Sequence, residues 1–89
     1  MNKILIKRLS EEEIKNKGIE SWPIWEKEVS RFPWTYCGKE ECLIIEGDFM
    51  VETEDGNYFI KPGDFVTFPD GLSCVWDIKN PVRKYYNFP

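Results

Sequence analysis

The stretch IKPGDFVTFPDG, which runs from Ile60 to Gly71, decides the fold class of this chain because it places two turns around one short apolar segment. Pro62-Gly63-Asp64 is typical of a turn with glycine at a positive-φ position, and Pro69-Asp70-Gly71 marks a second break. Between them, Phe65–Phe68 has the residue types of a β-strand. The stretch therefore predicts a short strand held between two tight turns.

Short β-prone runs separated by turn residues continue on both sides of this stretch. They are Trp34–Tyr36, Cys42–Glu46, Phe49–Glu54, Tyr58–Ile60, Cys74–Ile78 and Val82–Asn87. Gly47-Asp48 predicts a tight connection, and Asp55-Gly56 predicts a type I′ hairpin. Short strands separated at such regular intervals by turn residues indicate an all-β sandwich or barrel. In a barrel, closure of the sheet also removes exposed strand edges.

Residues 1–20 have a different pattern. Lys3–Arg8 predicts a short strand at the edge of a sheet. Ser10 and Glu13 have the spacing of a helix capping box, and Gly18 is placed to end a helix. These signals predict a short helix over Glu11–Lys17, and its mostly charged residues place it on the surface outside the barrel.

The segment Ser21–Phe32 is expected to be irregular at first, because Pro23 restricts the backbone of the residue before it. Ile24, Trp25 and Val29 are then expected to anchor this segment on the core. No linker or repeat divides the chain, so residues 1–89 predict one domain. Within it, residues 1–20 supply the outer strand and helix, and residues 21–89 supply the barrel.

Composition excludes several function classes. The net charge is −4 and the basic residues are scattered, which argues against a nucleic-acid partner. No apolar run approaches the roughly 20 residues that span a bilayer, so we expect no membrane partner. The three cysteines lie outside any CxxC pair, which fits a reducing compartment. We therefore expect a soluble, cytoplasmic protein.

The spacing of turn residues resembles that of the cupins. Glu40 stands seven residues before Gly47, and Gly63 is followed at cupin intervals by Pro69 and Gly71. The chain is most similar to the small cupins of the (S)-ureidoglycine aminohydrolase and EutQ type, within the RmlC-like cupin superfamily. The resemblance implies an all-β, jelly-roll-like cupin barrel with a short N-terminal helix. The stretches that carry it are SWPIWEKEVSRFPW (Ser21–Trp34), CLIIEG (Cys42–Gly47), IKPGDFVTFPDG (Ile60–Gly71) and PVRKYYNF (Pro81–Phe88).

The metal-ligand positions of cupins are mostly replaced here. Trp34 and Tyr36 occupy the His-X-His positions, Cys74 occupies the third histidine position, and the chain contains no histidine. Only Glu40 of the four ligand positions is kept. A catalytic zinc site usually needs three protein ligands. Glu40 and Cys74 supply two, and a third would require Cys37 or Cys42 to turn inward, so we expect no metal and no cofactor.

The residues at these positions are candidates for a ligand site. Trp34 and Tyr36 lie two apart on a strand and share a face, so both rings are expected toward the barrel interior, either as core packing or as pocket lining. Lys84 on the last strand could face inward and favour an anionic ligand, or lie on a solvated edge. The expected ligand-binding residues at the barrel mouth are Trp34, Tyr36, Glu40, Cys74, Trp76 and Lys84.

Three functions remain open from the sequence. The first is metal-independent binding of a small molecule in the barrel mouth. The second is an enzyme acting on a small polar metabolite, with Glu40 as acid or base and Tyr36 positioning the substrate; an aromatic mouth would favour the neutral form of Glu40, unless a hydrogen bond holds it. The third is a filled barrel that serves as an interaction module, and Ile4–Ile6 offers an edge strand for a homodimer.

Overall fold

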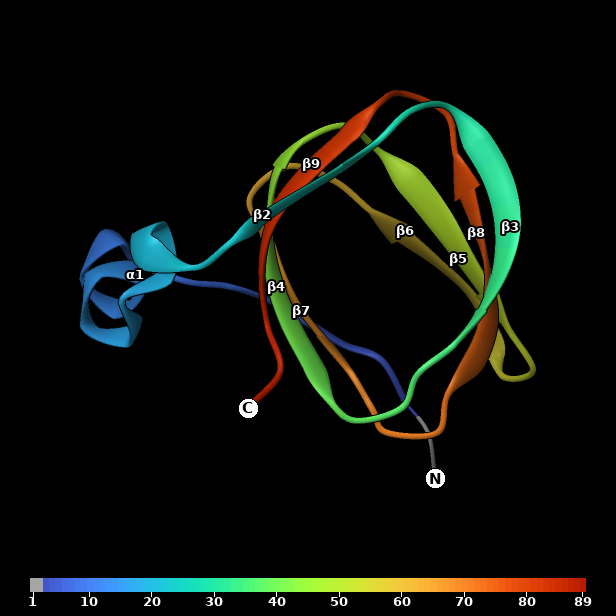
Figure 1. Cartoon of the computed structure of the whole chain (residues 1–89), viewed down its shortest axis with the longest axis horizontal. Coiled ribbons are helices and arrows are strands. Elements are labelled where there is room, and N and C mark those ends of the chain that lie inside the picture. Colours follow the sequence, from blue (N-terminus) through green and yellow to red (C-terminus); the bar gives the residue numbers. More distant parts are fainter. Residues whose placement is uncertain (1–2) are drawn as a thin grey trace.

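The computed structural model describes residues 3–89, which form two antiparallel sheets closed around a central space (Figure 1). The strand order is β1-β7-β4-β9-β2 in one sheet and β3-β8-β5-β6 in the other. The strands are β1 (Leu5–Arg8), β2 (Ile24–Lys27), β3 (Ser30–Thr35), β4 (Glu40–Glu46), β5 (Phe49–Thr53), β6 (Gly56–Ile60), β7 (Asp64–Phe68), β8 (Ser73–Ile78) and β9 (Val82–Asn87). The predicted all-β cupin-type barrel is confirmed.

The short helix forms where its capping signals predict it. Helix α1 spans Glu11–Lys17, the Glu13 backbone N–H donates to Ser10 Oγ at 3.1 Å, and the Ser10 N–H donates to Glu13 Oε1 at 3.0 Å. The bond from the Ser10 backbone also lowers the pKa of Glu13. Gly18 ends the helix in the left-handed conformation, with φ of 65°. The helix lies outside the barrel (Figure 1).

The segment after the helix covers the outer face of the five-stranded sheet. A short 3₁₀-helix, η1, spans Ile19–Ser21, and Ile19 is fully buried against Leu43 and Phe65. In β4, Leu43 faces this outer cluster while Cys42 and Ile44 face the barrel interior, which is the alternation expected of a strand. The sheet is therefore apolar on both faces, and each face has its own small core.

The expectation for the segment Ser21–Phe32 is partly wrong, because two strands begin in it. Strand β2 pairs with β9 and β3 pairs with β8. Ile24 and Val29 are exposed, and of the three expected anchors only Trp25 packs against the main core. The pairing is with strands far along the chain, so local propensity could not reveal it. Pro33 is tolerated within β3 because β3 is an edge strand.

The predicted type I′ turn at Asp55-Gly56 is also wrong. Such a turn needs positive φ at both central residues, but within residues 3–89 only glycines have positive φ. The two residues between β5 and β6 are Glu54 and Asp55, and Gly56, with φ of 129°, begins β6. The Thr53 hydroxyl closes the turn, accepting from the Asp55 N–H at 3.1 Å and donating to the Gly56 carbonyl at 2.8 Å.

Strand β1 lies at the edge of its sheet, as predicted. Leu5 and Ile6 are exposed there, whereas Ile4 is buried in the core. Pairing of two copies along this edge stays a prediction, which sedimentation equilibrium at high protein concentration can check. Among residues 3–89, the structure has no helix with the length and apolarity needed to cross a membrane.

Candidate functional site

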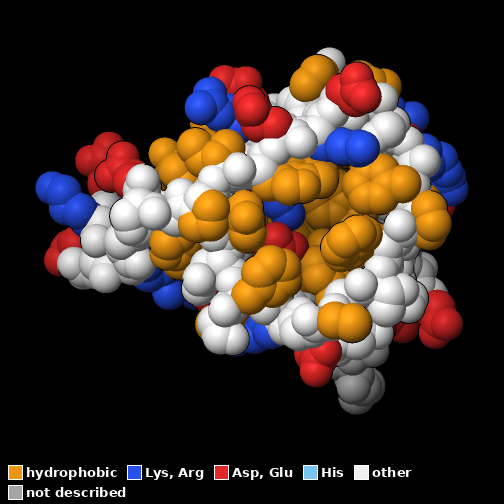
Figure 2. Space-filling model, in the orientation of Figure 1, with side chains coloured by type: hydrophobic (Ala, Val, Ile, Leu, Met, Phe, Trp, Pro, Cys, Tyr) orange, Lys and Arg blue, Asp and Glu red, His pale blue; other side chains and the backbone are white. Residues whose placement is uncertain are grey.

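A cavity of about 270 Å³ opens at one end of the barrel. Figure 2 shows this face, where hydrophobic side chains surround a hollow with basic and acidic side chains at its floor. Most of the lining is aromatic, and the charged members are one lysine and one glutamate. The lining residues are Trp25, Phe32, Trp34, Tyr36, Glu40, Trp76, Lys84, Tyr86 and Phe88.

The alternation of β-strands explains why these residues converge. Phe32 and Trp34 lie two apart in β3, and Lys84 and Tyr86 lie two apart in β9, so each pair faces the same side of its strand. Cross-strand register adds a tryptophan to each pair. Lys84 is directly opposite Trp25 of β2, and Phe32 is opposite a tryptophan of β8.

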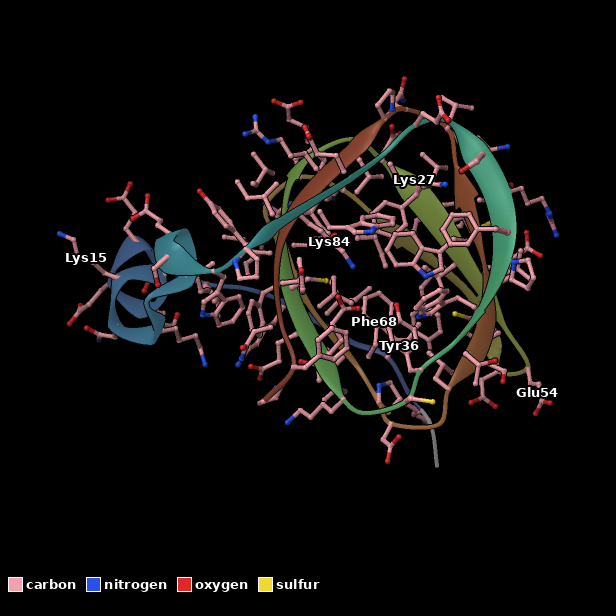
Figure 3. The ribbon with its side chains drawn as sticks, viewed as in Figure 1. Lys15, Lys27, Tyr36, Glu54, Phe68 and Lys84 are labelled. Carbon is pink, nitrogen blue, oxygen red and sulfur yellow. The ribbon has the colours of Figure 1, made fainter. Side chains whose placement is uncertain are left out.

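A buried ion pair forms the floor of the cavity. Lys84 Nζ donates to Glu40 Oε2 at 3.0 Å, and only 5% of the Lys84 side chain and 6% of the Glu40 side chain are exposed. Figure 3 shows Lys84 pointing into the barrel. The lysine is therefore inside and not on a solvated edge. Glu40 is a charge partner, not the isolated carboxyl that an aromatic mouth predicts.

Aromatic rings surround the lysine ammonium group. Nζ of Lys84 lies 4.9 Å from the ring centroids of Trp25 and Trp76 and 5.9 Å from that of Phe68. The faces of aromatic rings attract cations, most strongly when the cation is desolvated. The rings and the glutamate together compensate for the removal of this ammonium group from water. The cation inside the barrel is therefore the protein's own Lys84 side chain.

Tyr36 supplies a neutral hydroxyl beside the ion pair. Burial raises the pKa of Tyr36, and the negative charge of Glu40 raises it further, so the phenol keeps its proton. Its ring stacks on Phe68, with centroids 4.8 Å apart (Figure 3). Its backbone N–H donates to the Leu72 carbonyl at 2.8 Å. The Tyr36 hydroxyl donates no hydrogen bond to any of residues 3–89, so its proton is available to a ligand.

Trp76 forms the centre of the aromatic wall. Its ring stacks on Phe49 with centroids 4.4 Å apart, and it meets Trp25 edge to face at 5.7 Å. Its indole N–H is near enough to Tyr36 to favour a lower pKa for that phenol. It nevertheless makes no hydrogen bond of normal geometry with any described residue. Trp34 is 51% exposed and lies at the rim of the cavity.

Cys74 is the one predicted ligand residue that does not line the cavity. Its thiol is buried and donates to the Trp34 carbonyl, with a distance of 3.6 Å from sulfur to oxygen. Burial raises the pKa of Cys74 to about 11, so the group is a thiol near neutral pH. This environment does not favour a nucleophile.

The residues at the cupin metal position do not fit a metal ion. Within residues 3–89, no group of three or more His, Cys, Asp or Glu side chains is placed to hold one. Glu40 already binds the Lys84 ammonium group, whose charge would repel a second cation. The Cys74 thiol donates to the Trp34 carbonyl and does not line the cavity, so it is not placed beside Glu40 as a second ligand.

Sequence reasoning missed four lining residues, namely Trp25, Phe32, Tyr86 and Phe88. The signal for three of them was present, because Phe32 continues the alternation of Trp34 and Tyr36. Tyr86 and Phe88 likewise continue the alternation from Lys84. Trp25 reaches the site only through the pairing of β2 with β9, which the sequence does not state.

Two antiparallel sheets closed around a cavity that opens at one end define a small cupin barrel. The family model of the EutQ-like cupin domain matches residues 14–86, and the chain belongs to this family. A search of curated proteins gave no match.

Solved structures agree with this assignment. A DUF861 family protein from Thermotoga maritima is 50% identical, with a TM-score of 0.94, and the match covers 98% of this chain and 100% of that one. The Clostridium difficile EutQ protein is 19% identical, with a TM-score of 0.67, over 99% of this chain and 69% of that one. A putative ethanolamine utilization protein Q from Salmonella typhimurium is 24% identical, with a TM-score of 0.65, over 93% and 66%. The sequence identities to these last two proteins are low, so they show only that the fold is shared.

Proposed function

We propose that this cupin domain binds a small organic molecule in the barrel mouth without a metal ion. The observation that carries the proposal is an open, mostly aromatic cavity of about 270 Å³ with one buried ion pair at its floor. Ligand pockets are typically apolar clefts of roughly 300–1,000 Å³ with a few polar groups that fix orientation. The cavity is at the small end of this class, which suits a single ring with a short polar substituent.

The ion pair favours binding over acid–base catalysis. In the alternative enzyme hypothesis Glu40 would give or take a proton, but this carboxylate is held by Lys84 at 3.0 Å. Tyr36, with its raised pKa, can position a substrate but is a poor base. Binding requires only that these groups donate and accept hydrogen bonds. The alternative of a filled barrel is disfavoured by the cavity itself.

Tryptophan fluorescence offers a direct test. Of the four tryptophans in the chain, Trp25, Trp34 and Trp76 line the cavity. We expect ligands found in a fragment screen of the EDTA-treated protein to change this fluorescence at saturating concentration. Trp34→Ala removes a half-exposed rim residue and is expected to weaken binding about tenfold, since a buried aromatic contact contributes about 1 kcal/mol or more.

The matched control is Phe59→Ala, which removes an aromatic side chain that is 77% exposed and lies outside the cavity. It should leave binding unchanged. Binding that appears only after a divalent metal is added would overturn the metal-independent proposal. Equal affinities of the two variants and the unmodified protein would show that the ligand binds elsewhere.

A further inference from the structure

We propose that the ligand of this cavity is a neutral, planar molecule that carries an amide group, with the carbonyl directed at Lys84 and Tyr36 and the amide N–H at Glu40. This inference rests on the proposed function and adds the chemical class of the ligand. It follows from the hydrogen bonds that the floor of the cavity leaves unmade, from its charge balance and from the shape of its walls.

The lysine ammonium has donors to spare. A lysine carries three N–H donors, and Lys84 uses one of them on Glu40 Oε2. Within residues 3–89 it has no other hydrogen-bond acceptor, and its Nζ lies over the rings of Trp25 and Trp76, 4.9 Å from each centroid. A ring face is a weak substitute for an oxygen acceptor. A ligand carbonyl at the cavity floor would satisfy a second N–H.

Tyr36 and Glu40 complete the pattern of donors and acceptors. The Tyr36 hydroxyl keeps its proton because its pKa is raised, so it offers a second donor to the same carbonyl oxygen. Glu40 uses Oε2 on the lysine, and Oε1 makes no hydrogen bond with any described residue. A carboxylate oxygen only accepts, so it calls for a ligand N–H. An amide is the simplest group with an acceptor and a donor side by side.

The charge balance of the floor favours a neutral ligand. Lys84 and Glu40 balance each other's charge, and no other charged residue among residues 3–89 lines the cavity. A ligand carboxylate could accept a spare N–H of Lys84, but it would add a second negative charge beside Glu40 that no cation of the floor balances. A ligand ammonium would add a second positive charge beside Lys84 in the same way. Uncompensated charge in a buried site is strongly unfavourable.

The walls select a flat body. Trp25 and Trp76 meet edge to face, and Phe32 stacks on Trp76 with centroids 6.0 Å apart, so the aromatic surfaces above the floor are fixed by one another. Trp34 and Phe88 are each about half exposed at the rim. A planar ring can stack on such surfaces, whereas a puckered ring of the same size makes poorer contact.

The test is a set of probes with one shape and different charge, titrated into the full chain by calorimetry and tryptophan fluorescence. Benzamide is neutral, benzoate is anionic and benzylamine is cationic near neutral pH. Cyclohexanecarboxamide keeps the amide and loses the flat ring. We expect benzamide to bind at least tenfold more tightly than each of the other three.

Tyr36→Phe tests the floor without removing the stacked ring. It should weaken benzamide about two- to tenfold, the range of a single neutral hydrogen bond, and leave the affinity of toluene, which has no polar group, unchanged. Phe59→Ala serves as the surface control for both probes. A loss of toluene affinity in Tyr36→Phe would mean that the substitution disturbs packing. The relative affinities of benzamide, benzoate and benzylamine for the unmodified protein would then test the proposal without this variant.

The outcomes separate this inference from the function on which it rests. If benzoate or benzylamine binds more tightly than benzamide, the neutral amide is wrong while a binding cavity stands. If cyclohexanecarboxamide equals benzamide, the planar ring is wrong. If no probe of the series binds but an unrelated fragment does, the amide class is overturned and the binding function survives. If neither the series nor the fragment screen gives a Trp34-dependent signal, both proposals fall.

Discussion

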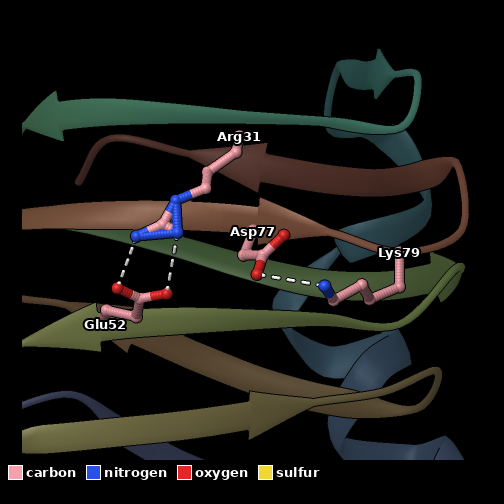
Figure 4. A network of polar contacts seen from close by, with 4 residues as sticks. All are labelled: Arg31, Glu52, Asp77 and Lys79. Carbon is pink, nitrogen blue, oxygen red and sulfur yellow. Dashed lines mark hydrogen bonds and ion pairs between the residues drawn. The ribbon is translucent and has the colours of Figure 1, made fainter.

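The floor of the cavity and the outer face of the four-stranded sheet hold ion pairs with nearly the same distance between charged groups but in opposite surroundings. Lys84 and Glu40 are 3.0 Å apart with exposed side-chain fractions of 5% and 6%. Arg31 and Glu52 are 2.8 Å apart with fractions of 54% and 27%. Figure 4 shows this outer pair, in which Arg31 of β3 reaches across β8 to Glu52 of β5. It also shows Asp77 of β8 and Lys79, just after that strand, which are 3.2 Å apart. Distance alone does not tell the pairs apart.

Burial gives the two regions different roles. In water, an ion pair gains little, because each charge is solvated almost as well without its partner. Inside the barrel, Lys84 and Glu40 are almost fully shielded from solvent, so each depends on its partner to balance its charge. The outer pairs are therefore expected to be dispensable. The inner pair is expected to keep two charged groups at the floor of the cavity, where they can bind a ligand. A purely structural core would not need such a pair.

Breaking the buried pair should give the largest effect. Lys84→Met leaves the Glu40 charge buried without its partner, and we expect a loss of about 3–5 kcal/mol in the free energy of unfolding. Urea denaturation followed by tryptophan fluorescence measures it. Glu40→Leu should produce a loss of similar size because it leaves the ammonium group alone.

The double variant Lys84→Met/Glu40→Leu is the matched control. Replacement of both charges by apolar side chains of similar size should restore most of the lost stability, because no buried charge is left unpaired. It should also abolish the preference for benzamide over toluene. A double variant that is as unstable as the sum of the single variants would show that packing, not charge, accounts for the losses.

The sequence predicted those parts of the fold that are local. The turn at Gly63, with φ of 91°, and the capping box at Ser10 and Glu13 are each set by a few adjacent residues, and both formed as expected. Strand β2 was missed because its partner, β9, lies more than fifty residues away. The hairpin type was wrong because Thr53, outside the Asp-Gly pair, closes the turn with its own hydroxyl.

The candidate site could be predicted one strand at a time. Alternation placed Trp34 with Tyr36 on one face, and it left open whether Lys84 faced inward. The pairing of Lys84 with Glu40 spans 44 residues and joins two strands, and no pattern in the sequence encodes it. Cys74 was expected at the mouth because it occupies the third histidine position of the cupin motif. Its carbonyl partner on β3 is a feature of strand pairing, which sequence spacing does not describe.

The cysteines give a second comparison between buried and exposed groups. We expect their effect on the free energy of unfolding to lie between the effects of breaking the two ion pairs. Cys37 is exposed, whereas Cys42 is fully buried and its pKa is raised to about 12, first by burial. Below pH 9 the Cys42 thiol keeps its proton in both the folded and the unfolded chain. Above pH 9 the thiol loses its proton in the unfolded chain but keeps it in the folded chain. The stability therefore falls with rising pH until the pH reaches the pKa of Cys42 in the folded protein, about 12. At pH 10, one unit above the ordinary pKa of 9.0, this linkage should remove about 1.4 kcal/mol.

Urea denaturation between pH 8 and pH 11 measures this slope. Cys42→Ala, compared at each pH, should make the slope shallower and leave the contribution of Cys74, whose pKa is also raised. Reaction with a thiol reagent at pH 8 provides an independent check. Of the three cysteines, Cys37 should react rapidly in the folded protein and all should react in urea. Rapid labelling of Cys42 or Cys74 in the folded protein would contradict the closed interior that the comparison assumes.

The smallest effect is expected on the outer face. Arg31 makes two hydrogen bonds to Glu52, at 2.8 Å and 3.2 Å, which is favourable geometry for an exposed pair. Because the arginine is half exposed, Arg31→Ala should lower the free energy of unfolding by less than about 1 kcal/mol, and 0.5 M salt should reduce the difference further. Salt should reduce the penalty of Lys84→Met much less, since both side chains of this pair are shielded from solvent. Equal salt sensitivity of the two variants would mean that solvent reaches both pairs, and the contrast between inside and outside would fail.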